Sequence, residues 1–213
     1  MEQKKISKSV LKRLPGYLAY LKNMSEGSPT HISATALANA LGMGEVQVRK
    51  DLAMVSDGGR PKIGYLRESL IEDIEQFLGY DNTTVAVLVG PGKLGQALMA
   101  YNGFDEYGLN ILAAFDARPK RDKTDEGKPI YPISELARFC RTHKVLMGII
   151  TTPAEAAQEV ADQLIAGGIK AIWNFAPTHL DVSSNILVQN ENMATSLAVL
   201  SVHLQAQMKD EKL

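Results

Sequence analysis

The sequence predicts a two-domain α/β protein in which a small helical domain precedes a doubly wound parallel sheet. Two observations predict this order. Residues 8–78 carry apolar side chains at helical spacings, interrupted by glycine-rich turns. Beyond residue 83, short apolar runs alternate with helical stretches, which is typical of buried parallel strands covered by helices. The predicted boundaries are 1–80 for the first domain, 81–190 for the second and 191–213 for a C-terminal helix.

Three helices are predicted at the start of the chain. Residues 8–25 place apolar side chains three and four positions apart on one face, although Pro15 inside this pattern predicts a kink or a shifted start. Ser33 is the candidate N-cap of the second helix, in ATALANAL. The third helix is predicted in GEVQVRKDLAMVS, so that the three together resemble a helix-turn-helix unit.

A hairpin and a fourth helix complete the first domain. The segment SDGGRPKIGY is rich in glycine and cations, which suits a short wing after the third helix. The next segment, RESLIEDIEQFLGY, is amphipathic and ends at Gly79, a natural position for the residue after a helix. The predicted domain is therefore a winged helix-turn-helix.

The second half predicts a Rossmann-type sheet and one helix left over. Its apolar runs include VAVLVG, LNILAAFD, VLMGIITT, KAIWNF and ILVQN, with helical stretches between the first four. The last segment, MATSLAVLSVHLQAQMKDEKL, has an apolar stripe on one face, formed by Leu197, Leu200, Leu204 and Met208. That stripe either closes its own domain or reaches a partner subunit.

A glycine-rich turn links the first predicted strand to the next helix. Gly90, Gly92 and Gly95 satisfy the G-x-G-x-x-G pattern, whose glycines allow a tight turn, close approach of a pyrophosphate and helix–strand packing. Asp116 ends the next strand at about the spacing expected of a ribose-binding carboxylate. This pattern predicts a dinucleotide site, and the alternative is a tight turn without a ligand.

The carboxylate at this position favours NAD over NADP, because it would repel a 2′-phosphate. Three cations just beyond it weaken that preference: Arg118, Lys120 and Arg121.

Charge separates the two halves. Residues 1–67 hold eleven lysines and arginines against five aspartates and glutamates, a net +6, while the whole chain carries −1. A basic first half in a chain that is slightly acidic overall predicts contact with a polyanion, although a solvated basic face has the same composition.

Gln47, Arg49 and Lys50 lie near the start of the third predicted helix, where a helix-turn-helix reads the major groove. Two cations of the wing can reach the DNA backbone or minor groove: Arg60 and Lys62.

Asp51 does not suit a DNA-facing surface, and we expect it to pair with a nearby group or to cap a helix. An ordinary solvated helix face remains the alternative interpretation of this region.

The sequence shows no residue pattern that is typical of an enzyme active site. No histidine follows a strand with a carboxylate partner close in sequence, and no Ser-His-Asp order, carboxylate pair or metal-spaced cluster stands out. A dehydrogenase also needs a domain that binds its substrate. In this chain the basic helical domain stands where that substrate domain would be expected. We therefore expect no catalysis and no metal. The alternatives are a small NAD-dependent oxidoreductase, a CoA-binding ligase-like subunit, or a DNA-binding protein with a vestigial nucleotide fold.

The composition predicts a cytoplasmic protein with no membrane contact. It is 45% hydrophobic and 22% charged. No apolar run approaches the about 20 residues that span a bilayer, and the basic N-terminus lacks the apolar core of a signal peptide. The single cysteine, Cys140, excludes an intrachain disulfide and is expected to be a packed thiol.

Several longer segments carry a family resemblance over nearly the whole chain. They are KRLPGYLAYL, QVRKDL, IGY, LVGPGKLGQAL, YNGF, AAFD and PAEAAQEVADQLIAGGIKAIWNFAP. In this order they resemble the Rex family of redox-sensing transcriptional repressors. The resemblance implies a homodimer of winged-helix and Rossmann subunits with exchanged C-terminal helices. It further implies binding to palindromic operators upstream of fermentation and respiration genes, and release when NADH displaces NAD⁺.

The resemblance also assigns roles to residues. It implies DNA contact by Ser33, Gln47, Arg49 and Lys50 with help from the wing, and an adenosine ribose at Asp116. The pyrophosphate is expected along the glycine turn, which comprises Gly90, Pro91, Gly92, Lys93, Leu94 and Gly95. The residues expected to line the rest of the NAD(H) pocket are Thr151, Thr152 and Pro153, with Tyr101 near the nicotinamide.

The chain departs from the family pattern at several positions. Ala19 stands where the family often has arginine, Asn192 where it usually has aspartate, and Met193 where an aromatic residue is common. The two missing charges normally work with the tyrosine as a switch. Pro91 removes one N–H donor from the glycine turn, and AMVSDGG replaces the usual start of the wing. These departures predict a different operator or a weakened NADH response.

Overall fold

A computed structural model describes residues 7–25 and 27–210. It divides into two compact units, Met1–Asn82 and Thr83–Leu213. Among the described residues, no helix is both long enough and apolar enough to cross a membrane.

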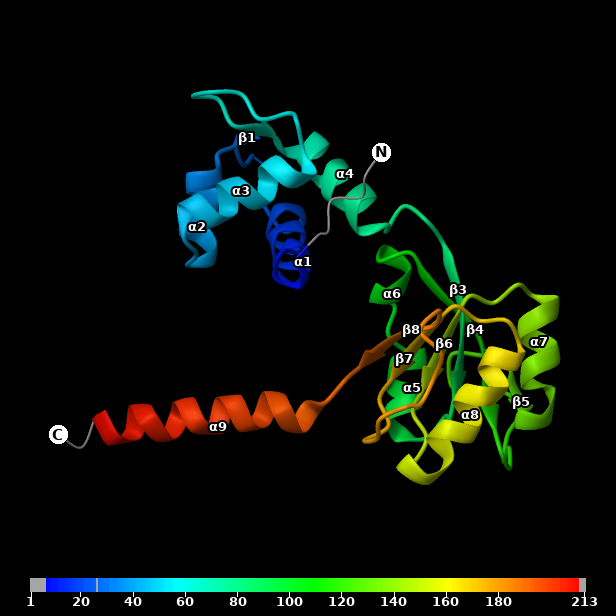
Figure 1. Cartoon of the computed structure of the whole chain (residues 1–213). Helices are drawn as coiled ribbons and strands as arrows, with labels where there is room; N and C mark the ends of the chain where they lie inside the picture. The colour runs from blue at the N-terminus through cyan, green and yellow to red at the C-terminus, as the bar shows by residue number, and fades with distance from the viewer. Residues whose placement is uncertain (1–6, 26, 211–213) are drawn as a thin grey trace. The chain divides into compact units, whose positions relative to one another are not determined.

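The first unit is a winged helix (Figure 1). Its elements are α1 (Lys8–Lys22), β1 (His31–Ile32), α2 (Ala34–Leu41), α3 (Glu45–Val55), β2 (Tyr65–Leu66) and α4 (Arg67–Leu78). The two short strands pair antiparallel. The wing, residues 56–65, narrows to a hairpin in which the amides of Arg60 and Gly64 each donate to the other residue's carbonyl at 2.9 Å. Lys62 lies at its tip with a φ of 66°.

Local signals explain where these helices begin and end. The Ser7 hydroxyl caps α1, and the Ser33 hydroxyl accepts a hydrogen bond from the Ala36 amide at 3.0 Å, so the predicted cap of α2 is confirmed. Gly79 ends α4 in the left-handed region, as expected. Pro15 lies inside α1, which runs unbroken from Lys8, so the expected shifted start is wrong. The capped first turn and a buried face hold the helix together past the missing amide.

The core of the winged helix is formed by the apolar faces of all four helices. Its fully buried members include Leu14, Tyr17, Leu37, Leu52 and Leu70. Because these side chains come from α1 to α4, the orientation of α3 within this unit depends on packing against the helices around it.

The second unit contains a six-stranded parallel sheet in the order β5-β4-β3-β6-β7-β8. The strands are β3 (Thr84–Val89), β4 (Leu109–Asp116), β5 (Ile130–Pro132), β6 (Met147–Ile150), β7 (Ala171–Asn174) and β8 (Leu187–Asn190). This is the Rossmann order, with the chain reversing direction across the sheet between β3 and β6. The predicted doubly wound sheet is confirmed.

Helices cover both faces of the sheet (Figure 1). They are α5 (Lys93–Met99), α6 (Gly103–Glu106), a 3-10 turn η1 (Ile133–Glu135), α7 (Leu136–Thr142) and α8 (Ala154–Ala166). Side chains alternate along β3: Val87 and Val89 join the core under α7 and α8, whereas Leu88 joins the core under α5. Cys140 is fully buried in the first of these cores, and burial raises the pKa of its thiol to about 11.

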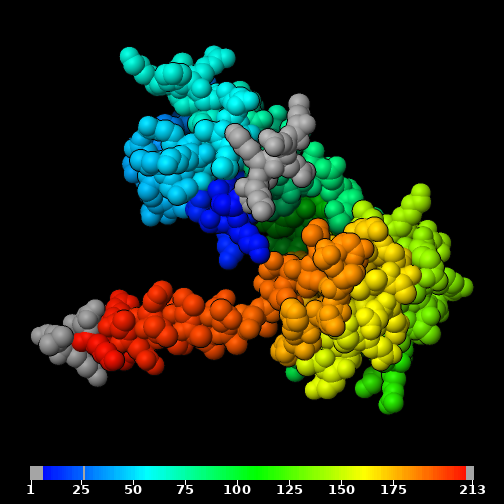
Figure 2. Space-filling view, viewed as in Figure 1, coloured from blue at the N-terminus to red at the C-terminus, as the bar shows by residue number. Residues whose placement is uncertain are grey.

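The last helix, α9 (Met193–Asp210), is uncovered. Its described side chains are exposed except Ser201, which is half-buried. Figure 2 shows the visible face of this helix, coloured orange to red, bare along its length. The exposed large apolar side chains are Met193, Leu197, Val199, Leu200, Val202, Leu204 and Met208.

Candidate nucleic-acid interface and nucleotide site

A basic groove lies between the start of α2, the middle of α3 and the wing. Its volume is about 490 Å³. Four of the six predicted DNA contacts line it together: Ser33, Arg49, Arg60 and Lys62. These residues are up to 29 positions apart in the sequence, and the fold gathers three cations and a hydroxyl on one surface.

Gln47 and Lys50 are exposed on α3 but do not line this groove. Arg49 forms an ion pair with Glu45 one turn earlier, and its side chain remains 66% exposed. An exposed pair of this kind contributes less than about 1 kcal/mol, so the guanidinium can exchange the carboxylate for a phosphate or a base. Ser33 caps α2 by accepting a hydrogen bond, which leaves its hydroxyl proton free to be donated.

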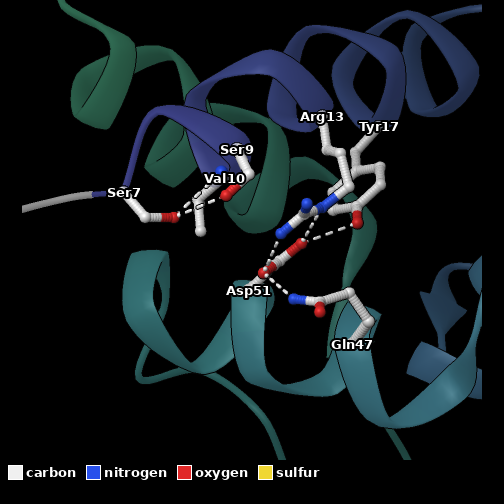
Figure 3. A network of polar contacts seen from close by, with 7 residues as sticks. All are labelled: Ser7, Ser9, Val10, Arg13, Tyr17, Gln47 and Asp51. Carbon is white, nitrogen blue, oxygen red and sulfur yellow. Dashed lines mark hydrogen bonds and ion pairs between the residues drawn. The ribbon is translucent and has the colours of Figure 1, made fainter.

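Asp51 turns inward, away from the solvent, and is 1% exposed. Figure 3 shows Arg13 and Tyr17 of α1 converging on its carboxylate. Arg13 donates Nε to Oδ2 at 2.7 Å and Nη2 to Oδ1 at 2.9 Å, while the Tyr17 hydroxyl donates to Oδ2 at 2.8 Å. Gln47 Nε2 donates to Oδ1 at 2.8 Å. Asp51 therefore pairs as expected, but beside the local Gln47 its charge partner is Arg13, 38 residues away.

Burial and hydrogen bonds within this cluster shift the pKa values of its members. Burial opposes ionisation of Asp51, yet the hydrogen bonds from Arg13, Tyr17 and Gln47 outweigh it and lower the pKa of the carboxyl. The hydrogen bond to Asp51 raises the pKa of Arg13, and burial raises that of Tyr17 to about 12. Sequence reasoning missed Arg13 and Tyr17, and the only signal was that Asp51 did not fit an exposed face.

The glycine turn follows β3 and is shaped by close backbone contacts. Gly90 has a φ of 95°, and a Cβ there would lie 3.0 Å from the backbone of Thr151. A Cβ on Gly95 would lie 2.5 Å from the Gly90 carbonyl oxygen. Nothing lies within 4 Å of where a Cβ on Gly92 would stand, so the middle glycine faces open space. This is the division of roles that the glycine pattern predicts.

The loop after β6 supports the turn. The Thr151 hydroxyl donates to the Gly90 carbonyl at 2.7 Å. The Thr152 hydroxyl is buried and has no hydrogen-bond partner among the described residues. An unpaired buried hydroxyl is costly, and a polar ligand at this point would satisfy it.

A hollow of about 310 Å³ opens at the carboxyl ends of β3, β4 and β6. It lies where the strand order reverses, which is where open α/β sheets bind ligands. Its lining includes six of the predicted residues: Gly90, Gly92, Asp116, Thr151, Thr152 and Pro153. Asp116 also borders a second hollow of about 430 Å³, which is lined by Pro91, Gln96, Arg118, Lys120 and Arg121 among others.

Of the other residues predicted in the glycine turn, Pro91 lines the second hollow, whereas Lys93, Leu94 and Gly95 line neither. Asp116 Oδ1 accepts a hydrogen bond from the Arg118 amide at 2.7 Å, which leaves Oδ2 for a ribose hydroxyl. Pro91 is buried, and its carbonyl accepts from Gln96 Nε2 at 2.9 Å, so the proline helps to shape the turn. The first bond of the α5 ladder runs from the Gln96 amide to the Gly92 carbonyl, so the amides of Lys93 and Leu94 lie ahead of it.

Tyr101 does not line either hollow. Its ring is 51% exposed and packs edge-on against Phe104, with centroids 4.9 Å apart. Phe104 in turn packs against Trp173 of β7, at 5.7 Å. The structure therefore places the tyrosine at the end of an aromatic row.

No group of three or more histidine, cysteine, aspartate or glutamate side chains could hold a metal ion in the part of the chain that the structure describes.

Fold and sites together define a class of two-domain proteins in which a winged helix is joined to a Rossmann unit. Family models match both parts: "Putative DNA-binding protein N-terminus" matches residues 5–53 and "CoA binding domain" matches residues 81–178. The redox-sensing transcriptional repressor Rex of Porphyromonas gingivalis is 40% identical over 197 residues, covering 92% of this chain and 90% of that protein. The corresponding protein of Clostridium botulinum Eklund 17B is 38% identical, covering 97% and 99%.

Solved structures of a Rex-family repressor, RSP, are similar to this chain over nearly its whole length. RSP in complex with β-NAD⁺ and operator DNA has a TM-score of 0.89 and 31% identity, covering 99% of this chain and 97% of that one. RSP in complex with β-NADH has a TM-score of 0.85 at the same identity, covering 99% of both chains. The chain belongs to the Rex family of redox-sensing transcriptional repressors.

Proposed function

We propose that this protein is a homodimeric repressor that binds palindromic operator DNA and changes its DNA affinity with the NADH/NAD⁺ ratio. The observation that carries the proposal is the match to RSP over 99% of the chain, because that relative was crystallised with both NAD⁺ and operator DNA. A match over one unit alone would support only one of the two ligands. We propose that the protein is cytoplasmic, in the same compartment as its operator DNA.

The DNA contacts belong to the N-terminal domain, proposed to span residues 1–80. Arg49 and Gln47 reach base edges from the start of α3, and Lys50 reaches guanine or phosphate. Ser33, Arg60 and Lys62 hold the backbone from the groove beside them. The support is that three cations line this groove and that each of them is exposed.

NAD(H) binds the Rossmann domain, proposed to span residues 81–190, at the hollow where the strand order reverses. The open side of Gly92 and the amides of Lys93, Leu94 and Gly95 receive the pyrophosphate, with Pro91 shaping the turn. Asp116 holds the adenosine ribose, while Thr151, Thr152 and Pro153 line the pocket. The unpaired Thr152 hydroxyl and the space at Gly92 both fit a polar ligand.

The bound dinucleotide supplies a nicotinamide ring that is cationic when oxidised and neutral when reduced, and we propose that Tyr101 lies against it. The residues of the pocket distinguish the two forms through this charge. Cofactor binding shifts the population of the DNA-competent dimer only by its differential affinity for the two conformations. The cofactor is an effector in this scheme and is not turned over.

Dimerisation uses α9, within residues 191–213. A helix with seven exposed large apolar side chains is unstable alone in water, and exchange with a second subunit would cover it. Two winged helices related by a two-fold axis then meet the two halves of a palindrome.

Two departures from the family pattern weaken the proposed response to NADH. Ala19 is exposed on α1 and carries no charge. Asn192 accepts a hydrogen bond from the Thr195 amide at 3.2 Å, so it retains the capping role of an aspartate without its charge. The double variant Ala19→Arg with Asn192→Asp is expected to release operator at lower NADH concentrations than the wild type. Equal or higher concentrations would contradict this part of the proposal.

The test of the whole proposal is selection of binding sites from randomised palindromic duplexes, followed by mobility shifts at several salt concentrations. A repressor enriches one sequence, and its affinity falls steeply with salt. An oxidoreductase or a CoA-binding subunit enriches none. Fluorescence titration of NADH is the second arm, and failure to bind would leave a DNA-binding protein with a vestigial nucleotide fold.

A further inference from the structure

The carboxylate of Asp51 is saturated with donors although it lies on the DNA-reading helix. Each oxygen accepts two hydrogen bonds: Oδ2 from Arg13 Nε and the Tyr17 hydroxyl, and Oδ1 from Arg13 Nη2 and Gln47 Nε2. Three of these four bonds come from α1 (Figure 3). The carboxylate is therefore a fixed point that does not turn with the exposed side chains around it.

This fixed point determines the orientation of the Gln47 amide. An ionised carboxylate only accepts hydrogen bonds, whereas a glutamine amide carries a donating nitrogen and an accepting oxygen. The lowered pKa of Asp51 keeps it ionised at neutral pH. Gln47 must therefore turn its nitrogen toward Oδ1, as the 2.8 Å bond shows, and the reverse orientation would set two oxygens against each other.

The free end of this amide is at the position that reads DNA. Gln47 is the third residue of α3 and its side chain is exposed. The N-terminal residues of a recognition helix contact base edges in the major groove. With one N–H of Nε2 donated to Asp51, the amide keeps two groups without a partner in the described part of the protein: the oxygen Oε1 and the second N–H of Nε2.

We propose that Asp51 is a positioning residue that sets the base preference of the recognition helix, an inference that rests on the DNA binding proposed above. By holding Nε2 of Gln47, it presents Oε1 to the operator. That oxygen accepts a hydrogen bond from the exocyclic amino group of adenine or cytosine. Guanine and thymine present a keto oxygen that would face Oε1 and are disfavoured, whereas adenine can also accept the second N–H of Nε2 at its N7.

The first experiment uses only a surface variant. The operator enriched by the wild type is changed at each base of one half-site, and affinities are measured for the wild type and Gln47→Ala. One position is expected to prefer an amino base by about fivefold to tenfold in the wild type and to show no preference in the variant. A keto preference at that position, or an unchanged profile in the variant, would overturn the proposal.

The second experiment separates positioning from folding. Asp51→Asn keeps the shape but offers both a donor and an acceptor, so the Gln47 amide is free to turn over. The amino preference at the same position is expected to fall to about twofold or less, with preferences elsewhere in the half-site retained. The double variant Asp51→Asn with Gln47→Ala should lose no more of the amino preference at that position than either single variant does.

Tyr17→Phe is the matched control, because it removes a donor from Oδ2 and leaves the bond between Gln47 and Oδ1 in place. This variant is expected to keep the amino preference. Retention of the preference in Asp51→Asn, or its loss in Tyr17→Phe, would contradict the assignment. Should Asp51→Asn not fold, the first experiment still decides the proposal. Failure of the wild type to enrich any operator would instead refute the proposed function.

Discussion

The glycine turn of the second unit and helix α3 of the first unit are held in place in opposite ways. The turn depends on close backbone contacts that only glycine allows, since a Cβ on Gly95 would lie 2.5 Å from the Gly90 carbonyl oxygen. The helix α3 is held by side chains, through a buried carboxylate whose main partner is 38 residues away. Changes in the turn should therefore act on one ligand, whereas changes around Asp51 should act on the whole winged helix.

The largest expected effect is on stability. Asp51→Asn leaves the Arg13 guanidinium without its charge partner, and we expect it to lower the free energy of unfolding by about 3 kcal/mol at neutral pH. Because the folded pKa of Asp51 is lowered, its stabilisation is present above the ordinary value of 3.8 and is lost as the pH falls below it. Urea unfolding should therefore show the gap between wild type and variant narrowing as the pH falls below 3.8. A gap independent of pH would contradict the role given to the charge.

The next effect separates the two ligands. Arg49→Ala is expected to weaken operator binding by about a hundredfold, because two copies act in the dimer and each contact to a base contributes about 1–3 kcal/mol. NADH affinity should not change. Arg138→Ala is the matched control, since Arg138 also forms an exposed ion pair within one helical turn, on the second unit. Unchanged DNA affinity in Arg49→Ala would show that α3 is not the reading helix.

A third change tests the open space in the turn. Gly92→Ala has room for its Cβ and an ordinary φ of −72°, so the folded protein should keep its melting temperature. The methyl group would stand where the pyrophosphate is proposed to lie, and NADH affinity is expected to fall about tenfold, measured by fluorescence. Gly95→Ala should lower the melting temperature as well. Full NADH affinity in Gly92→Ala would place the pyrophosphate elsewhere.

The smallest effect is expected at the wing. Lys62→Asn removes a charge while tolerating the left-handed φ of 66°. Loss of one phosphate contact per subunit should weaken binding about threefold to tenfold for every DNA sequence and lower the slope of affinity against salt by about 2 for the dimer. A loss confined to one operator sequence would mean that Lys62 reads bases.

The same contrast explains what could be predicted from the sequence. The glycine turn and Asp116 follow from short-range patterns, whereas Thr151 joins the same predicted site only through the family resemblance. β5 has only three residues and was missed, because so short a run carries no periodic signal. Arg13 and Tyr17 were missed as partners of Asp51, because their spacing on α1 shows only that the helix has a buried side. Long-range side-chain pairing leaves no mark in a local pattern.

The central claim is that one ligand controls the other, and a mobility shift on the selected operator tests it most directly. NAD⁺ and NADH are titrated in parallel into the preformed complex of protein and DNA. The account predicts release by NADH at concentrations at which NAD⁺ leaves the complex intact. Equal release by the two forms, or no release by either in a protein that binds both, would contradict it.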